Sequence, residues 1–213
     1  MDRQVIIFDF DGVIVDSLES IIEISRKLID RYDHQKKIPK EKAIALVRNK
    51  KLQEIFKKLG ISSIKIFFGL RKIRSELNKE IEYLKPIKGI KRVLNEIKKD
   101  GSKLGILTSN SKKNVNRFLR KNDLELFNFI YSEASFFNKH KVIDHLLDKQ
   151  KLKREEVVFI GDETRDVEAA KKEKIKIIAV SWGYNSKKLL AKEKPDFLVD
   201  KPSEIIKVLA NLK

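Results

Sequence analysis

The strongest constraint on the fold is a series of short apolar runs that each end in polar residues. Val5–Phe8, Leu104–Leu107 and Val157–Ile160 are rich in aliphatic residues and are too short to be buried helices. Three further short runs share this character: 129–131, 175–180 and 197–199. Helical segments separate the runs, and strands that alternate with helices predict a parallel α/β sheet with helices on both faces.

The stretch from 17 to 84 interrupts this alternation, because it contains no strand-like pattern. Ser17 is a helix-capping residue, and apolar residues follow it at helical spacing. Breaks between helices are expected at three places: Pro39, Arg48–Lys50 and Gly60–Ser62. We therefore expect two units, an α/β core formed by residues 1–16 and 85–213 and an all-helical insertion formed by residues 17–84. Ser203 is expected to cap a final helix of the core.

Composition excludes several classes of protein. The chain of 213 residues has no cysteine, which excludes structural disulfides, thiolate metal sites and cysteine nucleophiles. No apolar run approaches the roughly 18 residues that a membrane-spanning helix needs. The four apolar residues before Asp9 are too few for a secretory leader. We therefore expect a cytoplasmic protein with no membrane partner.

The charge is strongly positive and unevenly distributed. The 48 Lys and Arg residues outnumber the 31 Asp and Glu residues, for a net charge of +17. Residues 36–85 hold 15 basic and 5 acidic residues, whereas residues 1–30 hold 3 basic and 7 acidic residues. Such a balance is compatible with nucleic acid, with anionic lipid or with a small anionic substrate as partner. It is equally typical of a lysine-rich composition that covers solvated surfaces.

Polar clusters follow three of the predicted strands. Asp9 and Asp11 follow the first strand, Thr108–Asn110 follow the second, and Gly161–Asp166 follow another. The carboxyl ends of parallel strands form the usual ligand-binding edge of such a sheet, so these clusters are expected to meet there. Carboxylates without histidine or cysteine suit Mg²⁺. A carboxylate can attack phosphorus, and a second one nearby can donate and then withdraw a proton.

Four motifs in order resemble those of the haloacid dehalogenase-like hydrolase superfamily. Asp9-Phe10-Asp11-Gly12-Val13 resembles its first motif, DxDG followed by Val or Thr, and Leu104–Asn110 resembles its second. Lys139, in Phe136–Lys139, stands where the third-motif lysine is expected, and Ile160–Asp166 resembles the fourth motif. The helical insertion is similar to the cap of the phosphoglycolate phosphatase-like subfamily. The resemblance covers essentially the whole chain and implies a Rossmann-like core.

The resemblance implies a role for each catalytic residue. Asp9 is expected to be the nucleophile, and Asp11 the general acid and base. Thr108 and the backbone N–H of Ser109 are expected to bind the transferred phosphoryl group, although both residues have the alternative of capping the next helix. Lys139 is expected to neutralise charge on the nucleophile and phosphate, with the nearby Lys141 as a weaker candidate.

The resemblance also implies a Mg²⁺ site. Its expected ligands are Asp9, Asp11 through its carbonyl, and Asp162, with Asp166 in support. Asp166 has the alternative of serving only as an acidic residue in the first turn of a helix, where the helix dipole favours it. Glu163 is expected to act, if at all, through hydrogen bonds to the ligands.

Two further segments are candidates for contact with the substrate. Arg48, Asn49 and Lys50 interrupt the helical insertion, and the resemblance suggests a cap loop here that faces the active site. They are candidates for reading the non-phosphate end of the substrate, or else form a solvated turn. Trp182–Tyr184 follows a strand and is expected either to flank the site or to serve in packing.

These observations predict a Mg²⁺-dependent phosphatase that acts through an aspartyl-phosphate. The expected partner is a small phosphorylated metabolite such as phosphoglycolate, a sugar phosphate or a nucleotide, with no specific nucleic acid, and the chain is expected to be a monomer or homodimer. Three alternatives remain open. The first is a phosphosugar mutase of the same superfamily, whose first motif also holds both aspartates. The second is a basic nucleic-acid-binding protein with an idle hydrolase site. The third is a folded protein that keeps the motifs and has lost activity.

Overall fold

A computed structural model describes residues 4–32, 38–51, 54–55, 57, 60, 63–133 and 138–212. Phe136 and Phe137 of the predicted third motif lie outside these residues. The centre of the molecule is a sheet of six strands, all paired in parallel. In spatial order the strands are β5 (Phe129–Ser132), β4 (Lys103–Thr108), β1 (Val5–Asp9), β6 (Val157–Gly161), β7 (Lys176–Val180) and β8 (Phe197–Val199). The predicted α/β fold class is confirmed.

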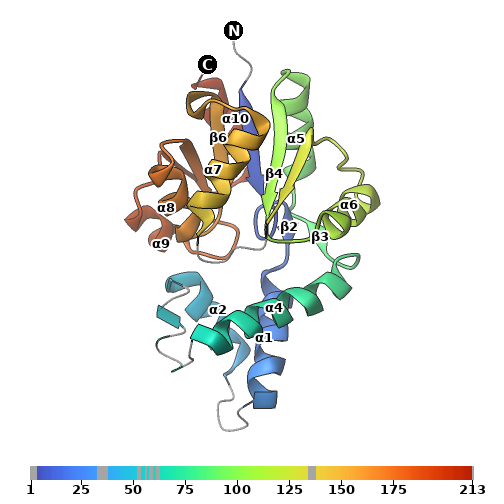
Figure 1. Cartoon of the computed structure of the whole chain (residues 1–213), viewed down its shortest axis with the longest axis vertical. Coiled ribbons are helices and arrows are strands. Elements are labelled where there is room, and N and C mark those ends of the chain that lie inside the picture. Colours follow the sequence, from blue (N-terminus) through green and yellow to red (C-terminus); the bar gives the residue numbers. More distant parts are fainter. Residues whose placement is uncertain are drawn as a thin grey trace.

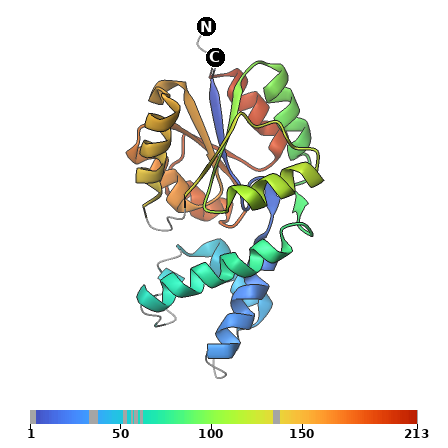
Figure 2. The same cartoon turned by 45° about the vertical axis from the view of Figure 1, so that its right-hand side comes forward.

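Helices cover both faces of the sheet, as Figures 1 and 2 show. One face carries α5 (Ile90–Lys99), α6 (Lys112–Lys121) and α10 (Pro202–Ala210). The other carries α7 (Lys139–Gln150), α8 (Thr164–Lys172) and α9 (Lys187–Lys192), and a short 3₁₀ helix, η1 (Arg154–Glu156), precedes β6.

Alternation along each central strand explains the two apolar layers. In β1, Ile6 and Phe8 belong to the layer under α5, α6 and α10, whereas Val5 and Ile7 belong to the layer under α7, α8 and α9. Successive side chains of a strand point to opposite faces, so a strand buried on both sides must be apolar throughout. Asp9, the last residue of β1, is the first polar one.

The segment between β1 and α5 is mainly helical and lies at one end of the sheet (Figure 1). It contains α1 (Leu18–Tyr32), α2 (Lys40–Asn49) and α4 (Ser63–Glu80), and apolar residues of α1 pack against Leu77 of α4. The chain enters and leaves this segment through two short antiparallel strands, β2 (Val15–Asp16) and β3 (Lys85–Pro86). No helix among the described residues is long and apolar enough to cross a membrane.

Two local expectations differ from the structure. Lys85–Pro86, which has the composition of a linker, pairs with β2 and forms a strand. Ser203 does not cap the last helix, because α10 begins one residue earlier at Pro202 and Lys201 is the capping position. Proline suits the first position of a helix, since its fixed φ is helical and its missing N–H needs no partner there. The carboxylate of Glu204 accepts the N–H of Asp200 instead (2.8 Å).

Candidate active site

Asp9 and Asp11 lie at the carboxyl end of the central strand. Asp9 is 7% exposed, and its Oδ1 accepts a hydrogen bond from the backbone N–H of Phe10 (2.7 Å). Asp11 accepts one through Oδ2 from the side-chain amide of Asn110 (3.1 Å), which follows β4. Burial, together with the negative charge of Asp9, raises the pKa of Asp11 to about 6. The Asp11 carboxyl can therefore exchange a proton close to neutral pH.

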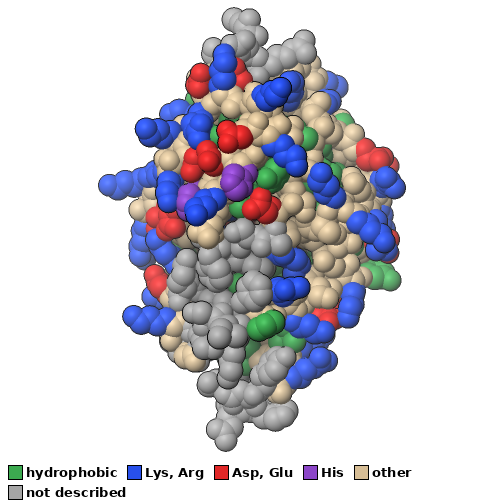
Figure 3. Space-filling model, in the orientation of Figure 1, with side chains coloured by type: hydrophobic (Ala, Val, Ile, Leu, Met, Phe, Trp, Pro, Cys, Tyr) green, Lys and Arg blue, Asp and Glu red, His purple; other side chains and the backbone are tan. Residues whose placement is uncertain are grey.

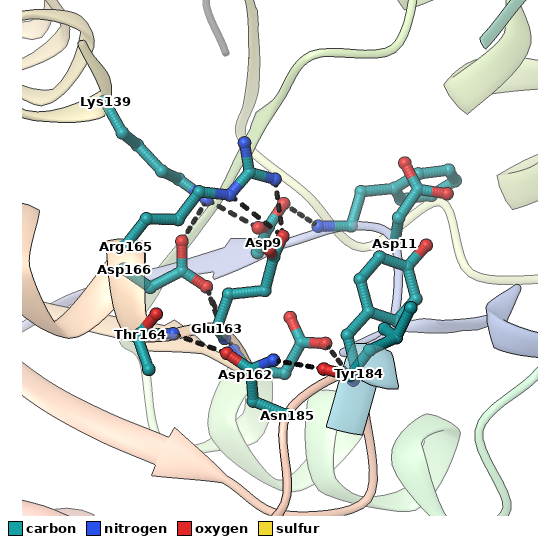
Figure 4. Close-up of polar contacts among 12 residues, drawn as sticks. Asp9, Asp11, Lys139, Asp162, Glu163, Thr164, Arg165, Asp166, Tyr184 and Asn185 are labelled. Atoms are coloured by element: carbon teal, nitrogen blue, oxygen red, sulfur yellow. Dashed lines mark hydrogen bonds and ion pairs between the residues drawn. The ribbon is translucent and has the colours of Figure 1, made fainter. Parts of the chain in front are cut away.

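Lys139 connects two of the carboxylates. It is the first residue of α7, and its Nζ lies 2.5 Å from Asp9 Oδ2 and 2.5 Å from Asp166 Oδ1. Figure 4 shows its side chain reaching toward both acids. Burial opposes the charge on Lys139, but Asp166 and Asp9 outweigh it and raise the pKa of the ammonium above its usual value. The group stays cationic. Lys141, the weaker candidate, is exposed.

Asp9, Asp162 and Asp166 form a cluster in which one carboxylate oxygen of each lies within 4.8 Å of the others. Asp162 and Asp166 are fully buried. Asp162 Oδ2 accepts the backbone N–H of Tyr184 (2.6 Å), whereas its Oδ1 is buried and has no hydrogen-bond partner among the described residues. Burial raises the pKa of Asp162 well above its usual value, and neighbouring carboxylates add to the effect.

This donor set fits a divalent cation. Burying ionised carboxylates is costly unless opposite charge compensates them, and Asp162 Oδ1 has no compensating donor in the part of the chain that the structure describes. Among the described residues three carboxylates converge here with no nitrogen or sulfur ligand, and hard cations such as Mg²⁺ prefer such a set of oxygen donors. Asp166 also caps α8, because its Oδ2 accepts the N–H groups of Asp162 and Glu163 (3.0 Å each). Its other oxygen remains directed at the cluster.

Two glycines make room for Asp162. A Cβ on Gly12 would lie 2.2 Å from Asp162 Oδ2, and a Cβ on Gly183 would lie 2.1 Å from the same atom. Gly12 also has a φ of +80°, which side chains disfavour. The backbone of two distant loops therefore approaches this carboxylate more closely than any other residue type would permit.

A pocket opens beside Asp9. It has about 310 Å³ of empty space, part of it open to solvent. Its lining is formed by Asp9, Leu107, Thr108, Ser109, Glu133, Lys139, Val142 and Arg165. Ser111, and not Thr108 or Ser109, is the N-cap of α6: its hydroxyl accepts the N–H of Asn114 (3.3 Å). The alternative that Thr108 and Ser109 cap this helix is therefore wrong, and both lie at the pocket.

Arg165 also lies at the site, although it is not among the residues predicted from the sequence. Its guanidinium pairs with Glu163 Oε1 and lines the pocket with Lys139 (Figure 4). Burial disfavours its charge, but Glu163, Asp166 and Asp9 raise its pKa, so it stays cationic. A signal was available, since Arg165 lies inside the fourth motif, directly before Asp166. Glu163 thus acts as the partner of this arginine. Asn110 was quoted only as part of a motif, yet it is buried and bonds Asp11.

Arg48, Asn49 and Lys50 lie at the end of α2, and none of them belongs to the described lining of the pocket. Arg48 donates to the backbone carbonyls of Gly183 (2.9 Å) and Ser181 (3.1 Å). Asn49 Oδ1 accepts a hydrogen bond from Ser186 (3.0 Å), and Lys50 is an exposed residue 3.6 Å from a Glu54 oxygen. Two of the three therefore contact the loop that follows β7.

Comparison with known proteins places this site in a family. Residues 6–180 match the family model described as haloacid dehalogenase-like hydrolase. The chain is 30% identical over 210 residues to a phosphoglycolate phosphatase of Synechococcus elongatus, covering 98% of each chain. It is 24% identical over 217 residues to a protein named Pyrophosphatase PpaX from Bacillus cereus, covering all of this chain and 99% of the other.

A solved structure has the same fold. The crystal structure of "a predicted phosphatase from Clostridium acetobutylicum" superposes with a TM-score of 0.84 at 20% identity, covering 98% of this chain and 99% of the other. The enzyme class predicted from the motifs, a phosphoric monoester hydrolase of this kind, is confirmed. The chain belongs to the haloacid dehalogenase-like hydrolase family.

Proposed function

We propose that this protein is a Mg²⁺-dependent phosphatase that hydrolyses small phosphate monoesters through a phosphoryl group carried on Asp9. One observation carries the proposal: the Asp9 carboxylate lines a pocket whose wall also offers the Thr108 hydroxyl, the Ser109 backbone and two partly buried cations, Lys139 and Arg165. Such a pocket can hold the three charged oxygens of a phosphoryl group against a nucleophile.

In the first step an oxygen of Asp9 attacks phosphorus and forms an O–P bond while the bond to the leaving oxygen breaks. The leaving oxygen takes a proton from Asp11 and departs as an alcohol. Lys139, which contacts Asp9, offsets the repulsion between two anions that would otherwise oppose this attack. Thr108 and the backbone N–H of Ser109 hold the phosphoryl oxygens in line.

In the second step Asp11, now ionised, accepts a proton from water as that water attacks the phosphorus. The O–P bond to Asp9 breaks, inorganic phosphate leaves and the carboxylate is regenerated. A pKa of about 6 suits both halves of this cycle, because the group must hold a proton in one step and accept one in the next. Burial of the Asp11 carboxyl is the main cause of that value.

Asp9, the backbone carbonyl of Asp11, and Asp162 would hold the Mg²⁺, with Asp166 in support. When bound, the cation neutralises charge on the phosphoryl oxygens. Support comes from the cluster of three buried carboxylates and from the buried Asp162 Oδ1. Asp166 positions the site from both sides, because it caps α8 with one oxygen and contacts Lys139 with the other.

The charge of the pocket and the names of the relatives support a substrate class. A pocket that opens to solvent and carries the cations Lys139 and Arg165 beside Asp9 suits the phosphoryl end of a small phosphorylated metabolite. Phosphoglycolate is a candidate because one relative carries that name, and pyrophosphate is a candidate because others do. We also propose that residues 17–84 act as a cap over this pocket and that the enzyme works in the cytoplasm as a monomer or homodimer.

The test is phosphate release from a panel of phosphate esters and one phosphoric anhydride, with Mg²⁺ and with a chelator. The panel holds p-nitrophenyl phosphate, phosphoglycolate, a nucleoside monophosphate, a hexose phosphate and pyrophosphate. Asp9→Asn is expected to lower turnover by at least about three orders of magnitude, because the amide is a poor nucleophile. The matched control is Asp148→Asn, which makes the same chemical change on the exposed side of α7 and should leave turnover unchanged.

Two outcomes would overturn the proposal. Phosphate release that persists in Asp9→Asn would remove this residue as the nucleophile. Isomerisation of the hexose phosphate without phosphate release would identify a mutase instead.

The nucleic-acid alternative also stays a prediction to be tested. In Figure 3, Lys and Arg side chains are spread over the visible face with acidic groups among them, and do not form one continuous patch. A gel shift in roughly physiological salt should retain no complex, since binding by dispersed charge is steeply salt-dependent.

A further inference from the structure

The loop formed by residues 181–186, between β7 and α9, makes hydrogen bonds with both the helical segment and the core. The guanidinium of Arg48 donates from one nitrogen to the carbonyl of Gly183 (2.9 Å) and from another to the carbonyl of Ser181 (3.1 Å). The backbone N–H of Ser186 donates in turn to the carbonyl of Arg48 (2.7 Å). The end of α2 therefore forms hydrogen bonds with three backbone groups of this loop.

The same loop holds Asp162. The N–H of Tyr184 donates to Asp162 Oδ2 (2.6 Å), and the N–H of Asn185 donates to the Asp162 carbonyl (3.2 Å). Asn185 is also bonded on both sides: its Oδ1 accepts the N–H of Thr164 (2.9 Å), and its Nδ2 donates to the carbonyl of Val47 (2.9 Å). One short loop thus contacts both the buried carboxylate and the end of α2.

We propose that Arg48 is a positioning residue that fixes loop 181–186 and, through the Tyr184 N–H, the carboxylate of Asp162. The proposal rests on the proposed function in that Asp162 is taken as a cation ligand. A guanidinium presents its donors in a rigid planar fork, so it fixes the spacing of two carbonyls that flank Trp182. Because Gly183 approaches Asp162 so closely, a small displacement of the loop moves the carboxylate.

A second consequence concerns the helical segment. If docking of α2 on the loop orders Asp162, then a cation bound at Asp162 must favour that docking to the same extent, because coupling between two binding events is reciprocal. The end of α2 therefore links the position of the helical segment to the occupancy of the cation site. A residue that only read the substrate would have no such effect in the absence of substrate.

The experiment compares the full-length wild-type protein with Arg48→Met and Arg48→Lys. Lys42→Met is the matched control, because it removes one positive charge from an exposed position of the same helix. Mg²⁺ affinity is measured by calorimetry without substrate, and hydrogen exchange is measured at the Tyr184 and Asn185 amides. Phosphate release with increasing substrate then separates KM from kcat.

Arg48→Met is expected to weaken Mg²⁺ binding about tenfold, the lower end of the range for residues that orient a metal ligand. The same variant should speed hydrogen exchange at the Tyr184 and Asn185 amides. Its kcat should also be lower than that of the wild type when substrate is saturating and the Mg²⁺ concentration saturates only the wild type. Arg48→Lys should rescue part of each effect, since an ammonium can donate to one carbonyl but lacks the fork. Lys42→Met should match the wild type.

Unchanged Mg²⁺ affinity and unchanged amide exchange in Arg48→Met, with only KM raised, would overturn the proposal and make Arg48 a substrate-reading residue. Weaker Mg²⁺ binding in Arg48→Met, combined with no phosphate release from any ester by the wild type, would support the positioning role and refute the proposed activity. If Arg48→Met does not fold, the comparison of Arg48→Lys with the wild type decides by the same readouts.

Discussion

Gly183→Ala tests how tightly the backbone around Asp162 must pack. The new Cβ would lie 2.1 Å from Asp162 Oδ2 and 2.5 Å from both its Cβ and its Cγ, whereas ordinary contacts begin at 3.4 Å. Because three atoms of one side chain are too close, rotation of the carboxylate alone gives no relief. The loop or Asp162 must move by about 1 Å or more, and the bond from Tyr184 N–H to Asp162 must stretch.

The expected cost has two parts. Overpacking a close contact costs about 1–3 kcal/mol, and loss of a buried hydrogen bond costs about 1–3 kcal/mol. Allowing for overlap between the two, the free energy of unfolding should fall by about 2–4 kcal/mol, which in a chain of this length lowers Tm by roughly 4–16 °C. A ligand displaced by 1 Å should also reduce kcat/KM by about a hundredfold, and Mg²⁺ affinity should fall by at least about tenfold.

Gly69→Ala is the matched control. Gly69 lies inside α4, and a Cβ there would meet nothing within 4 Å. Alanine is favoured over glycine in a helix by about 1 kcal/mol, so Tm should stay equal or rise slightly and kcat/KM should not change. Thermal melts, calorimetric Mg²⁺ titrations and phosphate-release kinetics on both variants complete the assay. A Gly183→Ala protein with wild-type Tm and wild-type kcat/KM would refute the reasoning.

Three other predictions concern stability. Phe118→Ala should lower the free energy of unfolding, measured by chemical denaturation, by about 3–5 kcal/mol, because this buried ring packs edge-on against Phe10 (centroids 5.4 Å apart). Tyr83→Ala removes an exposed ring and should lower the same free energy by less than about 1 kcal/mol. Burial would raise the pKa of Asp196, but Lys176 and a backbone N–H outweigh it and lower that pKa. Its stabilisation is present above the unfolded pKa of about 4 and is lost as pH falls through the lower folded value. The Tm gap between wild type and Asp196→Asn should therefore be constant near neutral pH and narrow as the pH falls below about 4, and a gap that stays constant in acid would contradict this. Mg²⁺ at about 100 times its Kd should raise the free energy of unfolding of the wild type by about 2.7 kcal/mol. Asp162→Asn should show no such shift, and an equal Mg²⁺ shift in both proteins would remove Asp162 as a ligand. Without the cation the variant should have a higher Tm than the wild type, because the raised pKa of Asp162 means that its ionised form destabilises the fold at neutral pH.

The central sheet could be predicted from the sequence because its strands are buried on both faces. Such strands must be apolar throughout, so runs like Val5–Phe8 and Val157–Ile160 stand out without any knowledge of their neighbours. The acids that follow them could also be predicted, since a polar residue directly after a buried strand marks its end. β2 and β3 were missed because strands of two residues carry no periodicity.

The contacts of Arg48 could not be predicted for a different reason. Its partners, Ser181 and Gly183, are more than 130 residues away, and they contribute only backbone carbonyls, which every residue has. No residue type in either segment therefore indicates the contact. Arg165 differs from Arg48 in this respect, because its position inside the fourth motif could have indicated that it lies at the site. Its role depended on burial beside Glu163, which sequence spacing does not reveal.

The net charge of +17 and the chemistry of the site act over different distances. At physiological salt the Debye length is about 8 Å, so dispersed surface cations raise the encounter rate with an anionic substrate but add little to its affinity once it is bound. In the proposed mechanism affinity comes from groups at the pocket, and of these Lys139 and Arg165 are partly buried beside carboxylates, so salt screens them less than the surface cations. Added salt should therefore lower kcat/KM through the encounter rate while leaving kcat nearly constant. The lysine-rich surface and the acidic site are compatible because the surface cations act at long range, whereas Lys139 contacts Asp9 directly and Arg165 lines the pocket.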